Sequence, residues 1–128
     1  MSAFEFQYFI SEKNGFVVAS LVGQLDQNCL AKLEEMSADV SGHQFRKLIL
    51  NFRDVSGVTG DAVPAIARLQ RLAREREADL RVCGLRPEVK DRLHREGILR
   101  PHELTDNLQT ALQSMIAVSR SSASKRAS

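Results

Sequence analysis

The sequence predicts an α/β domain in which a mixed sheet of four to five strands packs against about four helices. Short apolar or alternating segments are interleaved with segments whose apolar residues recur at helical spacing, in the order ββαβαβαβα. The chain has 128 residues, of which 43% are hydrophobic and 27% are charged, and this suits one globular domain with its own core. Right-handed crossovers should place successive helices on one face of the sheet unless the strand order reverses.

An antiparallel hairpin is expected at the N-terminus. Its first strand is predicted by apolar residues at every second position: Phe4, Phe6, Tyr8 and Ile10. Phe9 is the exception among the intervening polar residues. The pair Asn14-Gly15 is a strong signal for a tight turn, so residues 16–21 (FVVASL) form the second strand. Gly23 and Asp26 are expected to end that strand.

A helix and a central strand follow. Asp26 is a candidate N-cap for a helix from residue 27 to about residue 39. Its inward side is predicted to hold Leu30, Leu33, Met36, Ala38 and Val40. The dipeptide Ser41-Gly42 ends it, and the apolar run at residues 47–52 (KLILNF) fits a central strand.

The second half repeats this alternation. An amphipathic helix to about Glu77 is predicted by Ala62, Val63, Ile66, Leu69, Leu72 and Ala73. Residues 80–83 are then a strand, and a helix runs from Pro87 to a terminating Gly97.

The chain closes with an edge strand and a helix. A short edge strand within residues 98–104 is interrupted by Pro101. Thr105 or Asp106 caps the last helix, whose inward side is predicted to hold Leu108, Ala111, Leu112, Met115 and Ile116. We expect the folded domain to span residues 1–118.

Residues 119–128 (SRSSASKRAS) are a basic, Ser-rich tail that we expect to be disordered. Without the three basic residues of this tail, 15 basic residues remain against 16 acids. The basic character therefore belongs to the tail, and we expect no nucleic-acid partner. No apolar run reaches the roughly 20 residues that cross a bilayer, and the N-terminus does not look like a signal peptide. A cytoplasmic protein without direct membrane insertion is therefore expected.

The segment DVSGVTGDAVPAI, residues 54–66, links the central strand to the next helix. The carboxyl ends of strands are where α/β sheets usually place their sites. Pro64 has no N–H, so it loses no bond if it is the third residue of the helix. This favours Asp61 as the helix N-cap, with Thr59 and Gly60 in an exposed loop before it.

Three segments of the sequence resemble the STAS domain (the sulfate-transporter and anti-sigma-factor-antagonist family) over nearly the whole chain. LVGQLDQNCLAKLEE resembles the second strand and first helix of that family. LILNFRDVSGVTGDAVPAI resembles its apolar strand, an Asp-φ-Ser element and a D-S-[ST]-G-φ turn. RVCGLRPEVKDRLHREGIL resembles its late strand and Pro-x-Val helix. Their order and spacing carry the resemblance together.

The resemblance implies a bacterial anti-sigma-factor antagonist that binds a serine-kinase anti-sigma factor until its turn is phosphorylated. The family's turn aligns with Thr59, Gly60, Asp61 and Ala62, and this sequence departs at all four positions. Neither Gly60 at the acceptor position nor Asp61 beside it has a hydroxyl. Asp61 is either a plain helix cap or a permanent charge at a docking surface. Thr59 and Ser56 are candidates for a displaced phosphoacceptor or are local partners of the backbone.

The resemblance therefore implies a non-enzymatic signalling module in transcription regulation. The residues expected to bind the protein partner are Ser56, Gly57, Thr59, Gly60, Asp61 and Arg68. The alternative is a STAS subunit of a membrane anion or phospholipid transport system. The sequence leaves open whether a second copy of the chain covers the first strand.

We expect no catalysis, no cofactor and no metal. The sequence holds no Ser-His-Asp or Cys-His arrangement, no P-loop and no GxGxxG. A receiver domain is suggested by Asp54 at the end of a central strand, but the paired acids and the late Lys of receivers are missing. The histidines are scattered, and Cys29 and Cys83 are expected to be two small buried thiols.

Overall fold

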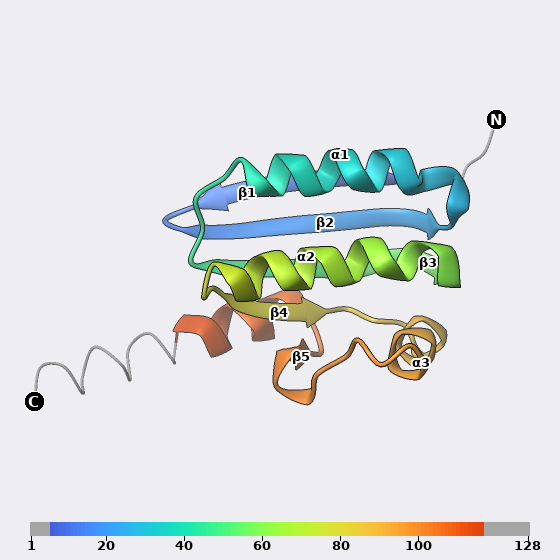
Figure 1. Cartoon of the computed structure of the whole chain (residues 1–128). Coiled ribbons are helices and arrows are strands. Elements are labelled where there is room, and N and C mark those ends of the chain that lie inside the picture. Colours follow the sequence, from blue (N-terminus) through green and yellow to red (C-terminus); the bar gives the residue numbers. More distant parts are fainter. Residues whose placement is uncertain (1–5, 117–128) are drawn as a thin grey trace, which may run out of the picture.

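The computed structural model of the chain describes residues 6–116 and contains one five-stranded sheet in the order β1-β2-β3-β4-β5 (Figure 1). The strands are β1 (Gln7–Lys13), β2 (Phe16–Leu25), β3 (Lys47–Val58), β4 (Asp79–Cys83) and β5 (Leu104–Thr105). β1 is antiparallel to β2, and every later neighbour is parallel. The predicted mixed sheet is thus confirmed.

The hairpin between β1 and β2 forms where the sequence predicts it. Asn14 and Gly15 both have positive φ, 52° and 83°, as a tight hairpin turn requires. Phe6 is 2% exposed, whereas Phe9 is 62% exposed on the opposite face. Phe4 lies outside the described residues. The expectation that Gly23 ends the second strand is wrong, because β2 continues to Leu25 through a register shift between Gly23 and Gln24.

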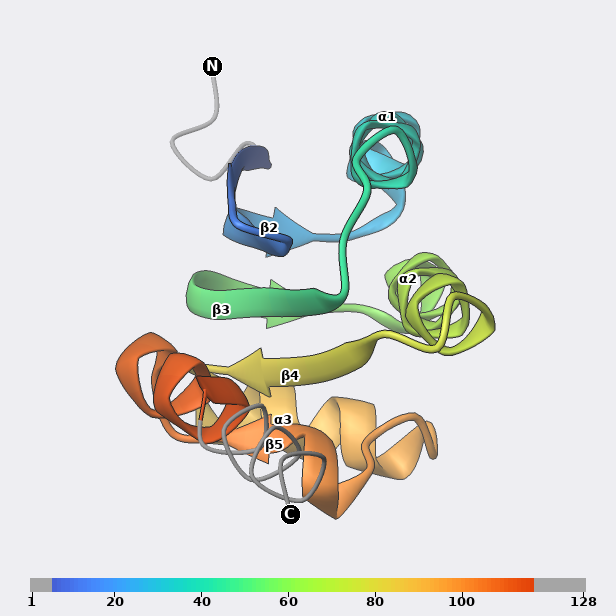
Figure 2. The same cartoon turned by 90° about the vertical axis from the view of Figure 1, so that its left-hand side faces the viewer.

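Four helices pack against the sheet: α1 (Leu30–Ser41), α2 (Val63–Glu75), α3 (Pro87–Arg95) and a helix over residues 108–116. α1 and α2 lie on one face of the sheet, and the helix over residues 108–116 lies on the other (Figure 2). The strand order does not reverse, so α1 and α2 share a face as right-handed crossovers require.

Asp26 starts the first helical segment, as predicted, since its carboxylate accepts a 2.9 Å hydrogen bond from the Asn28 amide. This cap opens a 3₁₀ turn, η1 (Gln27–Cys29), which leads directly into α1. The inward side of α1 is made by Leu33, Met36 and Val40. Ala38 was expected inside and is exposed, because it lies on the opposite side of the helix from Met36 and Val40.

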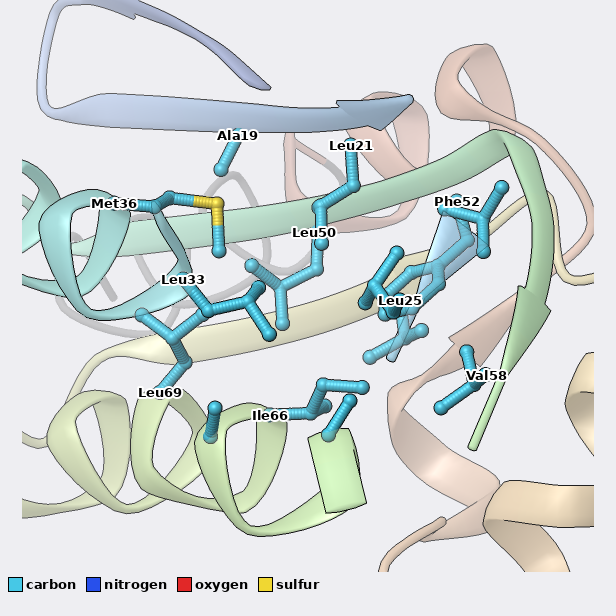
Figure 3. Close-up of a cluster of buried hydrophobic side chains, with 14 of the residues drawn as sticks. Ala19, Leu21, Leu25, Leu33, Met36, Leu50, Phe52, Val58, Ile66 and Leu69 are labelled. Atoms are coloured by element: carbon cyan, nitrogen blue, oxygen red, sulfur yellow. The ribbon is translucent and has the colours of Figure 1, made fainter. Parts of the chain in front are cut away.

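The main hydrophobic core fills the space between the sheet and the pair α1 and α2. Side chains of both helices point toward Leu50 of β3 in Figure 3: Leu33, Met36, Ile66 and Leu69. A smaller cluster on the other face packs Ile49 and Cys83 against Ala111 and Met115. β3 is therefore covered on both faces over this part of its length.

Two predictions near the C-terminal end are wrong. Only Leu104 and Thr105 form the edge strand, because a 3₁₀ turn, η3 (Pro101–Glu103), occupies the residues before them and proline favours the start of such a turn. The last helix is capped by Asn107, whose Oδ1 accepts a 2.8 Å hydrogen bond from the Thr110 amide. Thr105 belongs to β5 instead.

The predicted tail, residues 119–128, lies outside the described residues, and so does the domain boundary at residue 118. Within residues 6–116, none of the helices has the length and apolar character needed to cross a membrane.

Candidate functional site

Two of the residues predicted to bind a partner, Ser56 and Gly57, lie in the second half of β3. β3 runs to Val58, so Ser56 and Gly57 lie in the strand rather than in a loop. The register places Val55 opposite Gly23 and Gly57 opposite Gln24, which leaves Ser56 as the extra residue of a β-bulge. Bulges re-aim side chains at the ends of sheets. The Ser56 side chain is accordingly exposed.

Thr59 fixes the end of β3 to the end of β2. Its amide donates a 2.9 Å hydrogen bond to the carbonyl of Leu25, and its carbonyl accepts a 3.1 Å bond from the Ala62 amide. Its Oγ1 is buried and has no hydrogen-bond partner among the described residues. In this conformation the Thr59 hydroxyl is not accessible to a kinase, whereas that of Ser56 is.

Gly60 and Asp61 form an exposed 3₁₀ turn, η2 (Gly60–Ala62), between Thr59 and α2. The prediction that Asp61 caps the helix is wrong, because this turn intervenes and Ala62 occupies the N-cap position of α2 without a side-chain bond. Pro64 lies in the first turn of α2, where its missing N–H costs nothing, as expected. The Asp61 carboxylate has no hydrogen-bond or ion-pair partner within residues 6–116, so its charge faces solvent.

Two other segments lie beside this turn. The turn η1 follows β2 and lies next to η2, because the carboxyl ends of adjacent parallel strands share one edge of the sheet. A Cβ on Gly60 would come within 3.8 Å of Glu96 Oε2 at the end of α3, which is an ordinary contact. Glu96 is itself 3.7 Å from Arg92 Nη1. Sequence reasoning missed these neighbours, although the shared strand edge could have indicated η1.

Arg68 lies on the exposed side of α2, roughly 10 Å along the helix from Asp61 at 1.5 Å per residue. Its Nη1 is 3.9 Å from Glu34 Oε1 of α1. Exposed ion pairs of this kind contribute about 0–1 kcal/mol, so the Arg68 guanidinium can exchange its partner at little cost. Arg71, one turn further along, is exposed as well. The surface thus presents the Asp61 carboxylate on the turn, the Glu96 carboxylate beside it, and guanidinium groups along α2.

No group of three or more His, Cys, Asp or Glu side chains that could hold a metal occurs in the part of the chain that the structure describes. Cys29 and Cys83 are free and buried, as predicted. Burial raises the pKa of the Cys83 thiol to about 11 and also raises that of Cys29.

A model of the STAS domain family matches residues 9–111. The chain belongs to the STAS domain family. A search of curated proteins found no match.

Several solved structures are similar to this STAS domain. An anti-sigma factor antagonist from Mycobacterium paratuberculosis has a TM-score of 0.78 and 18% identity, with 88% of this chain and 96% of that chain covered. A variant of Moorella thermoacetica RsbS has a TM-score of 0.74 and 21% identity, with 89% and 98% covered. A sulfate transporter family protein from Wolinella succinogenes has a TM-score of 0.73 and 19% identity, with 84% and 90% covered. At these identities the likeness establishes the fold.

Proposed function

We propose that this STAS domain is a non-enzymatic interaction module that docks on a regulatory protein of the serine-kinase anti-sigma type. The docking surface consists of Ser56, Gly57, Thr59, Gly60, Asp61 and Arg68. The observation that carries the proposal is the exposed Asp61 carboxylate, which has no partner within residues 6–116, on the turn that follows the central strand β3. The fold shared with two structures described as anti-sigma factor antagonist and RsbS supports it.

The charge at the turn is permanent in this proposal. A phosphate would add about −1.5 to −2 charge and could be removed, whereas the Asp61 carboxylate supplies about −1 permanently. Gly60 and Asp61 offer no hydroxyl, and the Thr59 hydroxyl is buried. Ser56 is therefore the hydroxyl of the docking surface that a kinase could reach, four residues before the first residue of the turn, Gly60.

The module would work in the cytoplasm and without a cofactor. Its contribution to a partner is complementarity of shape and charge, with Asp61 facing a cation of the partner and Arg68 facing an acid. Arg68 lies at the rim, where charges govern the rate of association more than the affinity.

The second candidate function is a STAS subunit of a membrane anion or phospholipid transport system. It is supported by the likeness to the Wolinella succinogenes protein and to the murine Slc26a9 anion transporter, of whose chain this fold covers 18%. In this case the docking surface would meet a permease or ATPase chain. Co-purification with such a chain distinguishes the two functions.

The test is binding by calorimetry to a kinase-type anti-sigma factor from the same cell. Asp61→Lys should weaken binding at least about tenfold, because a like charge replaces the attractive one, and should shift thermal unfolding by no more than a few degrees. Glu75→Lys reverses an exposed charge at the other end of α2 and serves as the matched control. Equal binding by wild type and Asp61→Lys would contradict the proposal.

A second experiment concerns the missing acceptor. The double variant Gly60→Ser, Asp61→Ser restores hydroxyls to the turn, and the nearest atom to a Gly60 Cβ is 3.8 Å away, so the side chain fits. Phosphate that appears by mass spectrometry on this variant and not on the wild type would mean that the natural turn is a locked switch. Phosphate on neither would mean that the partner has no kinase activity toward this turn.

A further inference from the structure

Phe9 is the residue that breaks the alternation of apolar and polar side chains along the first strand. The apolar residues that keep the alternation, Phe6, Tyr8 and Ile10, belong to the main core or pack against it. Phe9 projects to the opposite side of the sheet, where it is 62% exposed and belongs to neither hydrophobic cluster of the described residues. The question of what covers the first strand therefore reduces to Phe9.

Val22 of β2 lies beside Phe9 on the same side of the sheet. In the register of the hairpin Phe9 pairs with Ser20 and Gln7 pairs with Val22, so Phe9 and Val22 are diagonal neighbours. Such neighbours are about 7–8 Å apart, within reach of an aromatic side chain. Val22 is half-buried and is not among the residues that pack against either cluster. We call Phe9 and Val22 the apolar patch.

The apolar patch borders the docking surface. Val22 pairs with Asp54 on the neighbouring strand β3, and Asp54 is exposed two residues before Ser56. Phe9 is two strands from β3, or about 10 Å, and the seven residues from Asp54 to Asp61 span at most about 23 Å. An interface of standard size covers about 800 Å² on each partner, which is roughly 30 Å across if it is round. One partner can therefore contact the apolar patch and the turn together.

Charged side chains lie around the apolar patch rather than within it. Arg53 Nε is 3.6 Å from Asp54 Oδ1, and these side chains are 80% and 53% exposed, so both can exchange partners at little cost. Lys13 is on the same side of β1 as Phe9 and four residues further along, or about 13 Å away. An apolar centre with a polar, solvent-accessible rim is the usual anatomy of a protein–protein interface.

We propose that the regulatory protein that docks on the turn also covers the apolar patch, with an apolar side chain of that partner seated on Phe9 and Val22. The inference rests on the proposed function, because continuity with the docking surface assigns the patch to the same partner. Phe9 is the apolar anchor, since aromatic side chains bury a large area and are enriched at interfaces. Toward β3 and the turn, the partner presents cations to Asp54 and Asp61.

Calorimetry of the full chain with a kinase-type anti-sigma factor from the same cell tests this extension. Phe9→Ala should weaken binding at least about tenfold, because the aromatic contact at the centre of the apolar patch is lost. Val22→Thr replaces a methyl group by a hydroxyl and should weaken binding by a smaller factor. Ile116→Ala is the matched control, because Ile116 is also a large exposed hydrophobic residue, at 42%, but lies at the hairpin end of the sheet. It should leave binding unchanged.

The outcomes separate this inference from the proposed function. Binding that Asp61→Lys weakens and folded Phe9→Ala leaves unaltered would overturn the inference alone. Binding that Phe9→Ala weakens and Asp61→Lys leaves unaltered would contradict docking at the turn, although the partner would still cover the apolar patch. A wild type that does not bind would overturn both. Circular dichroism melts establish that each variant is folded, and Val22→Thr decides the matter if Phe9→Ala does not fold.

Sedimentation equilibrium of the same variants tests the other occupant, a second copy of the chain. The inference expects that Phe9→Ala and wild type have the same mass in solution. A wild-type dimer that Phe9→Ala dissociates, with binding of the anti-sigma factor unaltered, would mean that a second copy covers the apolar patch. That result would overturn the inference and leave the docking surface at the turn as proposed.

Discussion

The first half of β3 is hydrogen-bonded to β2 on one side and β4 on the other, whereas residues 52–58 are paired in the described structure with β2 alone. The first half follows a regular register and is buried on both faces. The second half contains two register shifts and exposes Arg53, Asp54 and Ser56. One strand thus divides its length between holding the domain together and presenting a turn. Pairing of the first half with a strand on each side fixes where the turn projects.

The largest effect is expected in the first half of β3. Leu50→Ala removes a side chain that is fully buried among residues of α1 and α2, and the rigid surroundings should leave a cavity. We expect a loss of about 2–5 kcal/mol in the free energy of unfolding, measured by urea denaturation. The equivalent truncation in the second half, Ser56→Ala, should change it by less than about 0.5 kcal/mol. Similar losses in both variants would contradict the division of the strand.

Gly84 directly follows β4 and lies against Arg53, where the two halves of β3 meet. Its φ is +74°, and a Cβ there would lie 2.8 Å from the backbone nitrogen of Arg53. Gly84→Ala must therefore strain the backbone or move β3, and we expect a loss of roughly 1–3 kcal/mol in thermal denaturation. Gly57→Ala, in the second half of β3 with open space around its Cβ, is the matched control and should be close to neutral. Equal stability of the two variants would mean that the close approach at Arg53 is not rigid.

Local signals predicted the parts of the fold that depend on nearby residues. Asn14-Gly15 gave the hairpin, Asp26 the start of the first helical segment, and the run at residues 47–52 the buried half of β3. The second half of β3 depends on hydrogen bonds to a strand about 30 residues away, such as that from Thr59 to Leu25, which no local pattern records. The 3₁₀ turn that displaces Asp61 from the cap position begins directly after this hydrogen bond. The position of the turn along the chain was therefore predictable, and its geometry was not.

Cys83 of β4 pairs with Asn51 at the end of the first half of β3. Its titration can be used to test how well this end of the strand is buried. Burial raises its pKa from about 9 to about 11, so the folded state favours the neutral thiol. This contribution to stability is fully present below pH 9 and is lost as the pH rises toward 11. We expect urea denaturation to show a fall in stability over that interval that is smaller in Cys83→Ala. A native thiol that reacts with a disulfide reagent at pH 8 as fast as the unfolded chain would contradict this burial.

Thr59 is the last residue before the turn, and removal of its hydroxyl should raise the stability of the domain slightly. Its Oγ1 is buried and has no hydrogen-bond partner within residues 6–116, and a buried unsatisfied hydroxyl costs about 1–3 kcal/mol. Thr59→Val keeps the shape and removes that polar atom, so the free energy of unfolding should rise by about 1 kcal/mol, part of the gain being offset by imperfect packing. Thr59→Ser keeps the hydroxyl and should show no gain. If Thr59→Val instead destabilises the domain, the hydroxyl has a partner and takes part in holding the turn. If Thr59→Val raises the free energy of unfolding and leaves partner binding unchanged, Thr59 has a structural role only. The proposed recognition would then depend on Asp61.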